Sequence, residues 1–294
     1  MKSDKNILVA FLLNISFSIF EFVGGVLTNS VAIISDAVHD VGDSLSIGIA
    51  FLLEKKSKKK PDDTYTYGYS RYSVLAALIS SSILLVGSTL VIGSSINRII
   101  NPAKVNYNGM IIFALFGVLV NFLAAYSTRD GDSINQKAVN LHMLEDVLGW
   151  LVVLFGAILM RFTNISILDP LLSMGVSVYI LFNVIKHFKH ILDLFLEKAP
   201  ENISVEDIKN HVMEIEDVIE IHHIHIWSID GINNYATMHV VSKNKNSNLK
   251  SEIRHKLNDC GISHVTIELE GENEFCSDEE CHIDINVVKH HHHH

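Results

Sequence analysis

The sequence predicts a membrane protein with six transmembrane α-helices followed by a cytosolic α/β domain. Two observations support this fold class. Of the 294 residues, 48% are hydrophobic, and the mean hydropathy of +0.28 is too high for an ordinary soluble domain. The long apolar runs lie almost entirely within residues 1–195, whereas residues 197–289 are mixed and acidic. We therefore expect a membrane domain over residues 1–195 and a soluble domain over residues 196–289.

Six segments are apolar over the length of about 20 residues that a helix needs to cross the hydrocarbon of a bilayer. The first has no small-residue cleavage site, so we expect a retained helix rather than a signal peptide. The second and fifth are the least apolar, which is typical of spans that turn a polar face into a helix bundle. The expected spans are residues 7–28, 31–53, 72–96, 108–127, 138–160 and 168–194.

Basic residues predict the orientation of these spans. Lysines cluster before the first span, after the second and at the end of the sixth, and the other side has only Arg98, Lys104 and Arg161. The positive-inside rule therefore places both termini in the cytoplasm. The same lysines could instead contact anionic membrane lipid, and we adopt topology as their main meaning. The loop after the second span contains Lys55, Lys56, Lys58, Lys59 and Lys60.

The soluble part predicts the order α-β-β-α-β, a small ferredoxin-like or metallochaperone-like sheet with both helices on one face. Ser204 precedes acidic residues and is expected to cap the first helix. Asp230 and Gly231 predict the turn between the first two strands. We expect helices over residues 204–216 and 247–259, and strands over residues 218–229, 233–242 and 263–270.

Charge and cysteine content exclude two classes of protein. A net charge of −10, with 33 acidic against 23 basic residues, argues against a nucleic-acid partner. Three cysteines do not make a disulfide framework. The final residues, 290–294, look like a purification tag, which has no part in the fold.

Two His-x-x-x-Asp motifs lie inside expected spans. His39 and Asp43 belong to the second span, and His142 and Asp146 to the fifth. Four residues are about one helical turn, so each imidazole shares a face with its carboxylate. Two such helices would bring two nitrogens and two oxygens to one point, which suits a tetrahedral divalent metal such as Zn²⁺. The alternative is a pair of His–Asp hydrogen bonds that only hold helices together.

Other polar residues accompany these motifs. Asp36 shares the stripe of His39 and Asp43, and Asp40 lies beside it. In the first span, Asn14 and Glu21 share a face, and we favour a structural role for both. A metal site of this kind leaves an intramembrane zinc hydrolase and a membrane metal sensor open as functions. The hydrolase is disfavoured because the chain has no H-E-x-x-H motif.

Taken together, these motifs resemble those of the cation diffusion facilitators, a family that includes zinc transporters. The resemblance rests on Asn14, Glu21 and the stretch N-S-V-A-I-I-S-D-A-V-H-D-V-G-D over residues 29–43. It continues through Y-G-Y-S-R, H-M-L-E-D, Asp169-Pro170, L-F-L-E-K-A-P and I-H-H-I-H-I-W-S-I, in the right order along nearly the whole chain.

The resemblance implies a homodimeric exporter of the cytoplasmic membrane, bacterial in our expectation. It would move zinc or a related divalent ion out of the cytoplasm in exchange for protons. It implies that His39, Asp43, His142 and Asp146 are the transport site. Cadmium, cobalt, manganese and iron remain alternative ions, and a non-transporting sensor remains a lesser one. The soluble domain is expected to dimerise and to bind regulatory Zn²⁺.

The resemblance also suggests cytosolic metal ligands. His222 and His239 match ligand positions on the first two strands, and Glu270 ends the third strand, which His264 begins. His225 is more easily explained as strand packing, and His223 stands where the pattern often carries Asp.

Two other regions carry residues that could bind a metal. The tail carries Cys276, Cys281 and His282, which could bind zinc or belong to an incidental acidic tail. Some family members hold a metal in the cytosolic loop before the third span with Asp and two His. Tyr65 and Tyr69 replace those histidines here, so we expect no such site despite Asp62 and Asp63.

Overall fold

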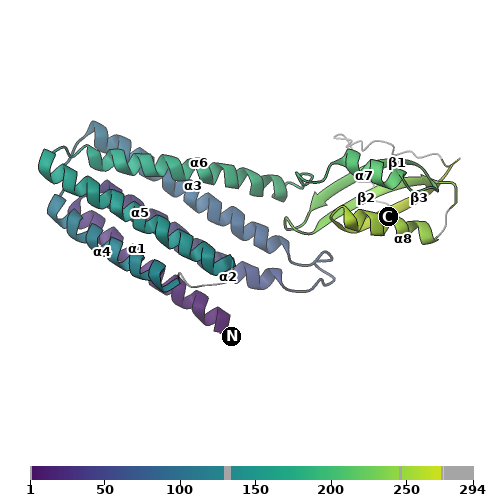
Figure 1. Cartoon of the computed structure of the whole chain (residues 1–294), viewed down its shortest axis with the longest axis horizontal. Helices are drawn as coiled ribbons and strands as arrows, with labels where there is room; N and C mark the ends of the chain where they lie inside the picture. Colours follow the sequence, from purple (N-terminus) through teal and green to yellow (C-terminus); the bar gives the residue numbers. More distant parts are fainter. Residues whose placement is uncertain (1, 129–133, 245–246, 273, 275–294) are drawn as a thin grey trace, which may run out of the picture. The chain divides into compact units, whose positions relative to one another are not determined.

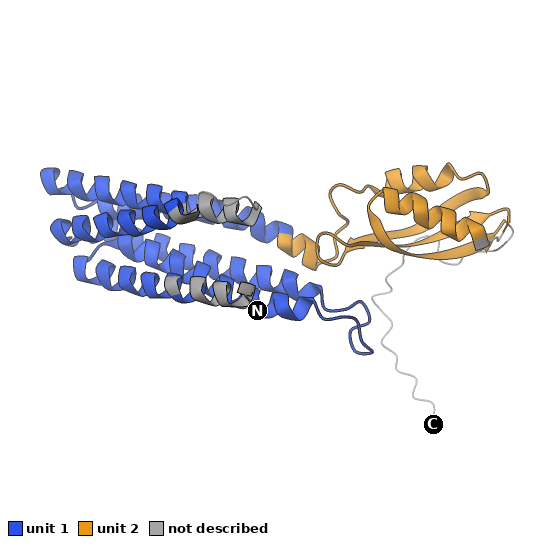
Figure 2. Ribbon diagram, turned by 60° about the horizontal axis from the view of Figure 1, so that its bottom comes forward, with its two compact units in different colours: residues 1–190 blue, residues 191–294 orange. Residues whose placement is uncertain are grey.

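The protein forms two compact units, unit 1 over residues 1–190 and unit 2 over residues 191–294 (Figure 2). The computed structural model describes residues 2–128, 134–244, 247–272 and 274. Within these ranges it describes only the backbone of residues 2–10, 13, 127–128, 134–143 and 247. The predicted Cys276, Cys281 and His282 cluster and the predicted tag at residues 290–294 lie outside the described residues.

Long helices run side by side through the first 195 residues, and each occupies one of the apolar segments that predicted a span (Figure 1). The helices extend the expected spans by a few residues, because a helix continues past the hydrocarbon until a cap or turn ends it. They are α1 (Lys2–Thr28), α2 (Val31–Ser57), α3 (Arg71–Ile100), α4 (Tyr107–Thr128), α5 (Ile134–Thr163) and α6 (Leu168–Phe195).

Within the described side chains, α3 to α6 contain stretches long and apolar enough to cross a membrane. The described part of α1, Asn14–Thr28, is apolar but shorter. α2 falls short of this apolarity because Asp36, Asp40 and Asp43 interrupt it. Charged groups in such a helix are costly unless they serve a site, so these aspartates make α2 a candidate for carrying one.

The beginning of α2 is held by a buried carboxylate from α6. Asp169 is 0% exposed. Its Oδ1 accepts hydrogen bonds from Ser30 Oγ at 2.6 Å and the Ala32 amide at 3.3 Å, and its Oδ2 accepts one from the Val31 amide at 2.7 Å. These amides have no partner inside the helix, and the positive end of the helix dipole favours an anion there. Asp169 therefore fixes the start of the helix that carries His39 and Asp43.

Small polar residues join the helices of unit 1 elsewhere. Ser35 of α2 meets Ser177 of α6 with 3.1 Å between their Oγ atoms, and Ser95 of α3 donates to Ser173 of α6 at 3.1 Å. Small residues let helix backbones approach closely in a membrane. The apolar core between α4 and α5 centres on Trp150, whose ring covers Gly117 so closely that a Cβ there would clash.

Unit 2 has the predicted α-β-β-α-β order. It consists of α7 (Val205–Met213), β1 (Val218–Ser228), β2 (Asn234–Ser242), α8 (Ser247–Asp259) and β3 (Ile262–Gly271). Ser204 caps α7 as predicted, because its Oγ accepts a hydrogen bond from the Asp207 amide at 3.0 Å. The predicted turn also lies between β1 and β2, where Asp230 Oδ1 accepts from the Ile232 and Asn233 amides and Gly231 adopts a φ of +87°.

The sheet has the order β1-β2-β3, with β1 antiparallel and β3 parallel to β2. α7 and α8 lie together on one face of the sheet (Figure 2). Alternate residues of β2, including Ala236, Met238 and Val240, are buried against these helices. The residues between them, His239 among them, face the side that the helices leave open.

Strand β1 has a β-bulge where its histidines lie. His222 pairs with His239, but His225 pairs with Thr237, so β1 carries one residue more than β2 over this stretch. His223 lies in this bulge and has a φ of +51°. A bulge of this kind turns two successive side chains toward one face of the sheet. The bulge therefore places one more histidine on the open face than a regular alternation of side chains would.

Candidate metal sites

In α2, His39 and Asp43 lie on one face, one helical turn apart. His39 Nε2 is 3.7 Å from Asp43 Oδ2, and the side chains are 27% and 19% exposed. A small cavity beside His39 is lined by Ser35, Ser88 and Ser177 among other residues of α2, α3 and α6. The predicted pair therefore exists as a half-buried imidazole and carboxylate, with His39 next to a small cavity in the bundle.

The acidic residues around this pair come from three helices. Asp146 of α5 interacts electrostatically with Asp36 and Asp40 of α2 and with Glu21 of α1. Glu21 is 0% exposed. Several carboxylates in a setting without water favour a cation between them. The backbone of His142 lies in α5, one turn before Asp146, but its side chain is outside the described residues, so its place in the site stays a prediction.

A second group lies on the open face of the sheet in unit 2. His222, His239 and Glu270 each offer a donor atom, and these atoms lie within 4.8 Å of one another. His239 Nδ1 is 2.7 Å from Glu270 Oε1, and His222 Nε2 is 3.3 Å from Glu270 Oε2. Each of the three strands supplies one member of this group.

The chemistry of these donors suits a metal ion. Both ring nitrogens of His222 and Oε2 of Glu270 are buried and make no hydrogen bond within the described part of the chain. Buried polar atoms are rarely left without a partner, so such atoms point to a ligand. Two imidazole nitrogens and a carboxylate oxygen are typical ligands of zinc.

More residues surround this group than the sequence indicated. His223 stacks on His239 with 4.8 Å between ring centroids and meets His225 edge-on at 4.8 Å. Glu268, which is not among the predicted ligands, has its Oε2 3.4 Å from His239 Nε2. Its position two residues before Glu270 could have revealed it, because alternate strand residues share a face. Burial lowers the pKa of His225, and the neighbouring His223 and His239 lower it further.

His264 is not brought together with the other predicted ligands. It is exposed near the start of β3 and its ring lies against Tyr235, with 5.3 Å between centroids. Glu270 is six residues further along the strand, which corresponds to roughly 20 Å. One ion cannot contact both side chains within a single chain.

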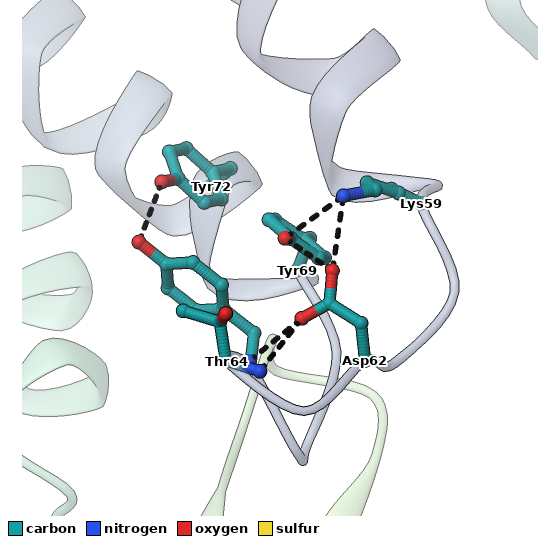
Figure 3. Close-up of polar contacts among 6 residues, drawn as sticks. Lys59, Asp62, Thr64, Tyr69 and Tyr72 are labelled. Carbon is teal, nitrogen blue, oxygen red and sulfur yellow. Dashed lines mark hydrogen bonds and ion pairs between the residues drawn. The ribbon is translucent and has the colours of Figure 1, made fainter.

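The loop between α2 and α3 uses Asp62 for a different purpose. Its Oδ2 accepts a hydrogen bond from Tyr69 Oη at 2.7 Å and lies 3.0 Å from Lys59 Nζ, while its Oδ1 accepts from the Thr64 and Tyr65 amides (Figure 3). These donors hold the pKa of Asp62 well below its usual range. Both oxygens of this carboxylate therefore already have partners within the loop.

Comparisons with known proteins agree with this arrangement. Residues 7–196 match the family described as "Cation efflux transmembrane domain", and residues 200–272 match "Cation efflux protein, cytoplasmic domain", whose short name ZT_dimer indicates dimerisation. The chain is thus an integral membrane protein with a cytoplasmic C-terminal domain.

Curated relatives span nearly the same length. The "Cadmium, cobalt and zinc/H(+)-K(+) antiporter" of Bacillus subtilis is 36% identical over 92% of this chain and 90% of the relative. The "Zinc transporter ZitB" of Escherichia coli is 31% identical over 99% of this chain and 94% of its own. The "Metal cation efflux system protein CzcD" of Cupriavidus metallidurans is 28% identical over 91% and 87%. With both domains matched in order, the predicted resemblance is confirmed: the chain belongs to the cation efflux family, the cation diffusion facilitators.

Proposed function

We propose that this protein exports Zn²⁺ from the cytoplasm in exchange for protons, at a site formed by His39, Asp43, His142 and Asp146. The observation that carries the proposal is the His39–Asp43 pair, half-buried on the one bundle helix interrupted by three aspartates. Membership of the cation efflux family makes the chain a transporter and not an intramembrane hydrolase. The relatives named as zinc transporters and as cadmium, cobalt and zinc antiporters support zinc, with cadmium and cobalt as further cargo.

The residue types explain how such a site could release its cargo. Imidazole and carboxylate ligands hold zinc only when the His is neutral and the Asp is ionised, so protons compete with the metal. An unperturbed His titrates near pH 6.5, within reach of a modest gradient. We propose that the site opens alternately to the two sides, and that protons from the acidic side displace zinc there.

We further propose that His222, His239 and Glu270 hold a regulatory zinc ion in a homodimer. The family name supports dimerisation, and a metal is supported by the convergence of the three donors and by the buried ring nitrogens of His222, which make no hydrogen bond within the described residues. When bound, the ion would link the three strands of unit 2, because each strand supplies one of its ligands. It would bias the transporter only if it binds one arrangement of the two protomers better than another.

The experiment that tests the transport proposal is a flux assay with full-length protein in liposomes that carry a pH gradient. Uptake is measured with zinc, cadmium, cobalt, manganese and iron in turn. We expect zinc flux that rises with the gradient and stops when an ionophore collapses it. Zinc binding without gradient-driven flux would favour the metal-sensor alternative and contradict the proposal.

A further inference from the structure

The end of α2, together with the loop that joins it to α3, forms a concentrated positive surface. Residues 54–71 contain six cationic and three acidic side chains, a net charge of +3 in a chain whose total is −10. α2 and α6 end on the same side of the membrane, because the four helices from α3 to α6 make an even number of crossings. Unit 2 follows α6 and is cytoplasmic. The loop therefore faces the cytoplasmic leaflet, where anionic lipids lie.

Only some of these lysines are neutralised. Lys58 Nζ is 3.2 Å from Glu54 Oε1, and Lys59 Nζ is 3.0 Å from Asp62 Oδ2. Within the described residues, no carboxylate lies within 4.0 Å of the ammonium groups of Lys55, Lys56 or Lys60. All three are exposed. The protein itself thus leaves three positive charges uncompensated at the end of a membrane helix.

The loop is fixed in shape and does not depend on a ligand to order it. Lys59, Asp62 and Tyr69 form a closed triangle, in which Lys59 Nζ is also 3.0 Å from Tyr69 Oη (Figure 3). Gly68, with a φ of +84°, turns the chain back so that its amide donates to the Tyr65 carbonyl at 2.9 Å. A preformed surface loses little entropy when it binds.

Aromatic side chains accompany the lysines. Lys56 Nζ lies 4.1 Å from the centroid of the Tyr72 ring, which holds the ammonium group in place. Tyr65 and Tyr67 are 43% and 55% exposed. Tyrosine favours the headgroup region of a bilayer, where its ring contacts lipid and its hydroxyl stays hydrated.

We propose that Lys55, Lys56 and Lys60 bind the phosphate of an anionic phospholipid in the cytoplasmic leaflet. Their charge matches the phosphate, and the tyrosines match the headgroup region around it. The site is separate from both proposed metal groups, and the proposal does not depend on transport.

The test measures which lipids stay with the protein. Full-length protein is placed in phosphatidylcholine vesicles with a minor share of phosphatidylglycerol and extracted in polymer-bounded discs, and the retained lipid is counted by mass spectrometry. We expect phosphatidylglycerol to be enriched over the bulk. Lys55→Gln/Lys60→Gln should weaken this binding by about 5-fold for each lysine removed. Lys186→Gln/Lys189→Gln, which removes equal charge from α6, should retain the enrichment.

Three outcomes would overturn the proposal. Unchanged enrichment in Lys55→Gln/Lys60→Gln shows that the loop binds no lipid. An equal loss in both double variants shows that general charge attracts the lipid, without a local site. A third arm uses pure phosphatidylcholine vesicles and inorganic phosphate: if phosphate binds there and depends on Lys55 and Lys60, the ligand is a soluble anion. A thermal unfolding curve equal to that of the parent shows that each variant is folded.

Discussion

His239 Nδ1 on β2 lies 2.7 Å from Glu270 Oε1 on β3, and this contact joins two strands at the centre of the cytosolic metal group. Glu270 is only 5% exposed, because the histidines of β1 and β2 cover it. A buried carboxylate needs a hydrogen-bond donor or a cation beside it, and a metal ion held together with His222 and His239 would supply the cation. Its environment therefore links the stability of unit 2 to occupancy of this group.

Removing either partner should lower metal binding by unit 2. We expect His239→Ala and Glu270→Gln each to bind about one zinc ion fewer per chain than the parent, since each supplies one ligand. His264→Ala is the matched control, because His264 lies at the far end of β3 and should leave the stoichiometry unchanged. Equilibrium dialysis with zinc analysis measures all three. Parent stoichiometry in His239→Ala would remove this residue from the site.

The bulge in β1 should tolerate glycine and resist β-branched residues at position 223. His223 has a φ of +51°, which glycine adopts freely and valine does not. In metal-free protein, His223→Val should lower stability by about 1 kcal/mol or more, whereas His223→Gly should stay near the parent. His264→Val, in an ordinary exposed strand position, is the control. Thermal unfolding with a chelator present ranks the stabilities of these variants. An equal loss of stability in the Gly and Val variants would argue against backbone strain at His223.

Asp169 should stabilise unit 1 through the start of α2. Asp169→Asn keeps one acceptor oxygen but cannot accept from both Ser30 and Val31 as the carboxylate does, so we expect a loss of about 2 kcal/mol. Asp193→Asn is the matched control. It removes a largely exposed ion pair with Lys198 and should cost little. The melting temperatures of the two purified variants test this prediction. Similar values for both would show that the buried cap stabilises unit 1 no more than the exposed ion pair does.

The α2–α3 loop should keep its structure in acid. Because the folded pKa of Asp62 is depressed, its contribution to stability is present above the unfolded value of about 3.9 and is lost only as pH falls below it. The Thr64 and Tyr65 amides, which donate to Asp62, should stay protected from hydrogen exchange down to about pH 4 and lose protection below it. Asp62→Ala, which removes the acceptor oxygens, should expose both amides at neutral pH. Loss of protection in the parent near pH 5 would contradict the assignment.

Much of this fold could be predicted because its signals are local. The apolar segments, the Ser204 cap and the strand alternation of unit 2 all depend on neighbouring residues, and the structure follows them. The contact of Asp169 with Ser30 joins residues 139 positions apart, so no local sequence pattern predicts it. The bulge at His223 likewise depends on the register between β1 and β2. The distance of His264 from Glu270 follows from the length of β3, which a motif match does not measure.

The most direct test of the central claim is zinc flux through His39→Ala and Asp43→Asn protein in liposomes with a pH gradient. Asp63→Asn, in the exposed α2–α3 loop, serves as the control with an equal change of side chain. The account predicts that both site variants lose gradient-driven zinc transport while Asp63→Asn keeps the parent rate. Transport at the parent rate by folded His39→Ala protein would contradict the assignment of the transport site.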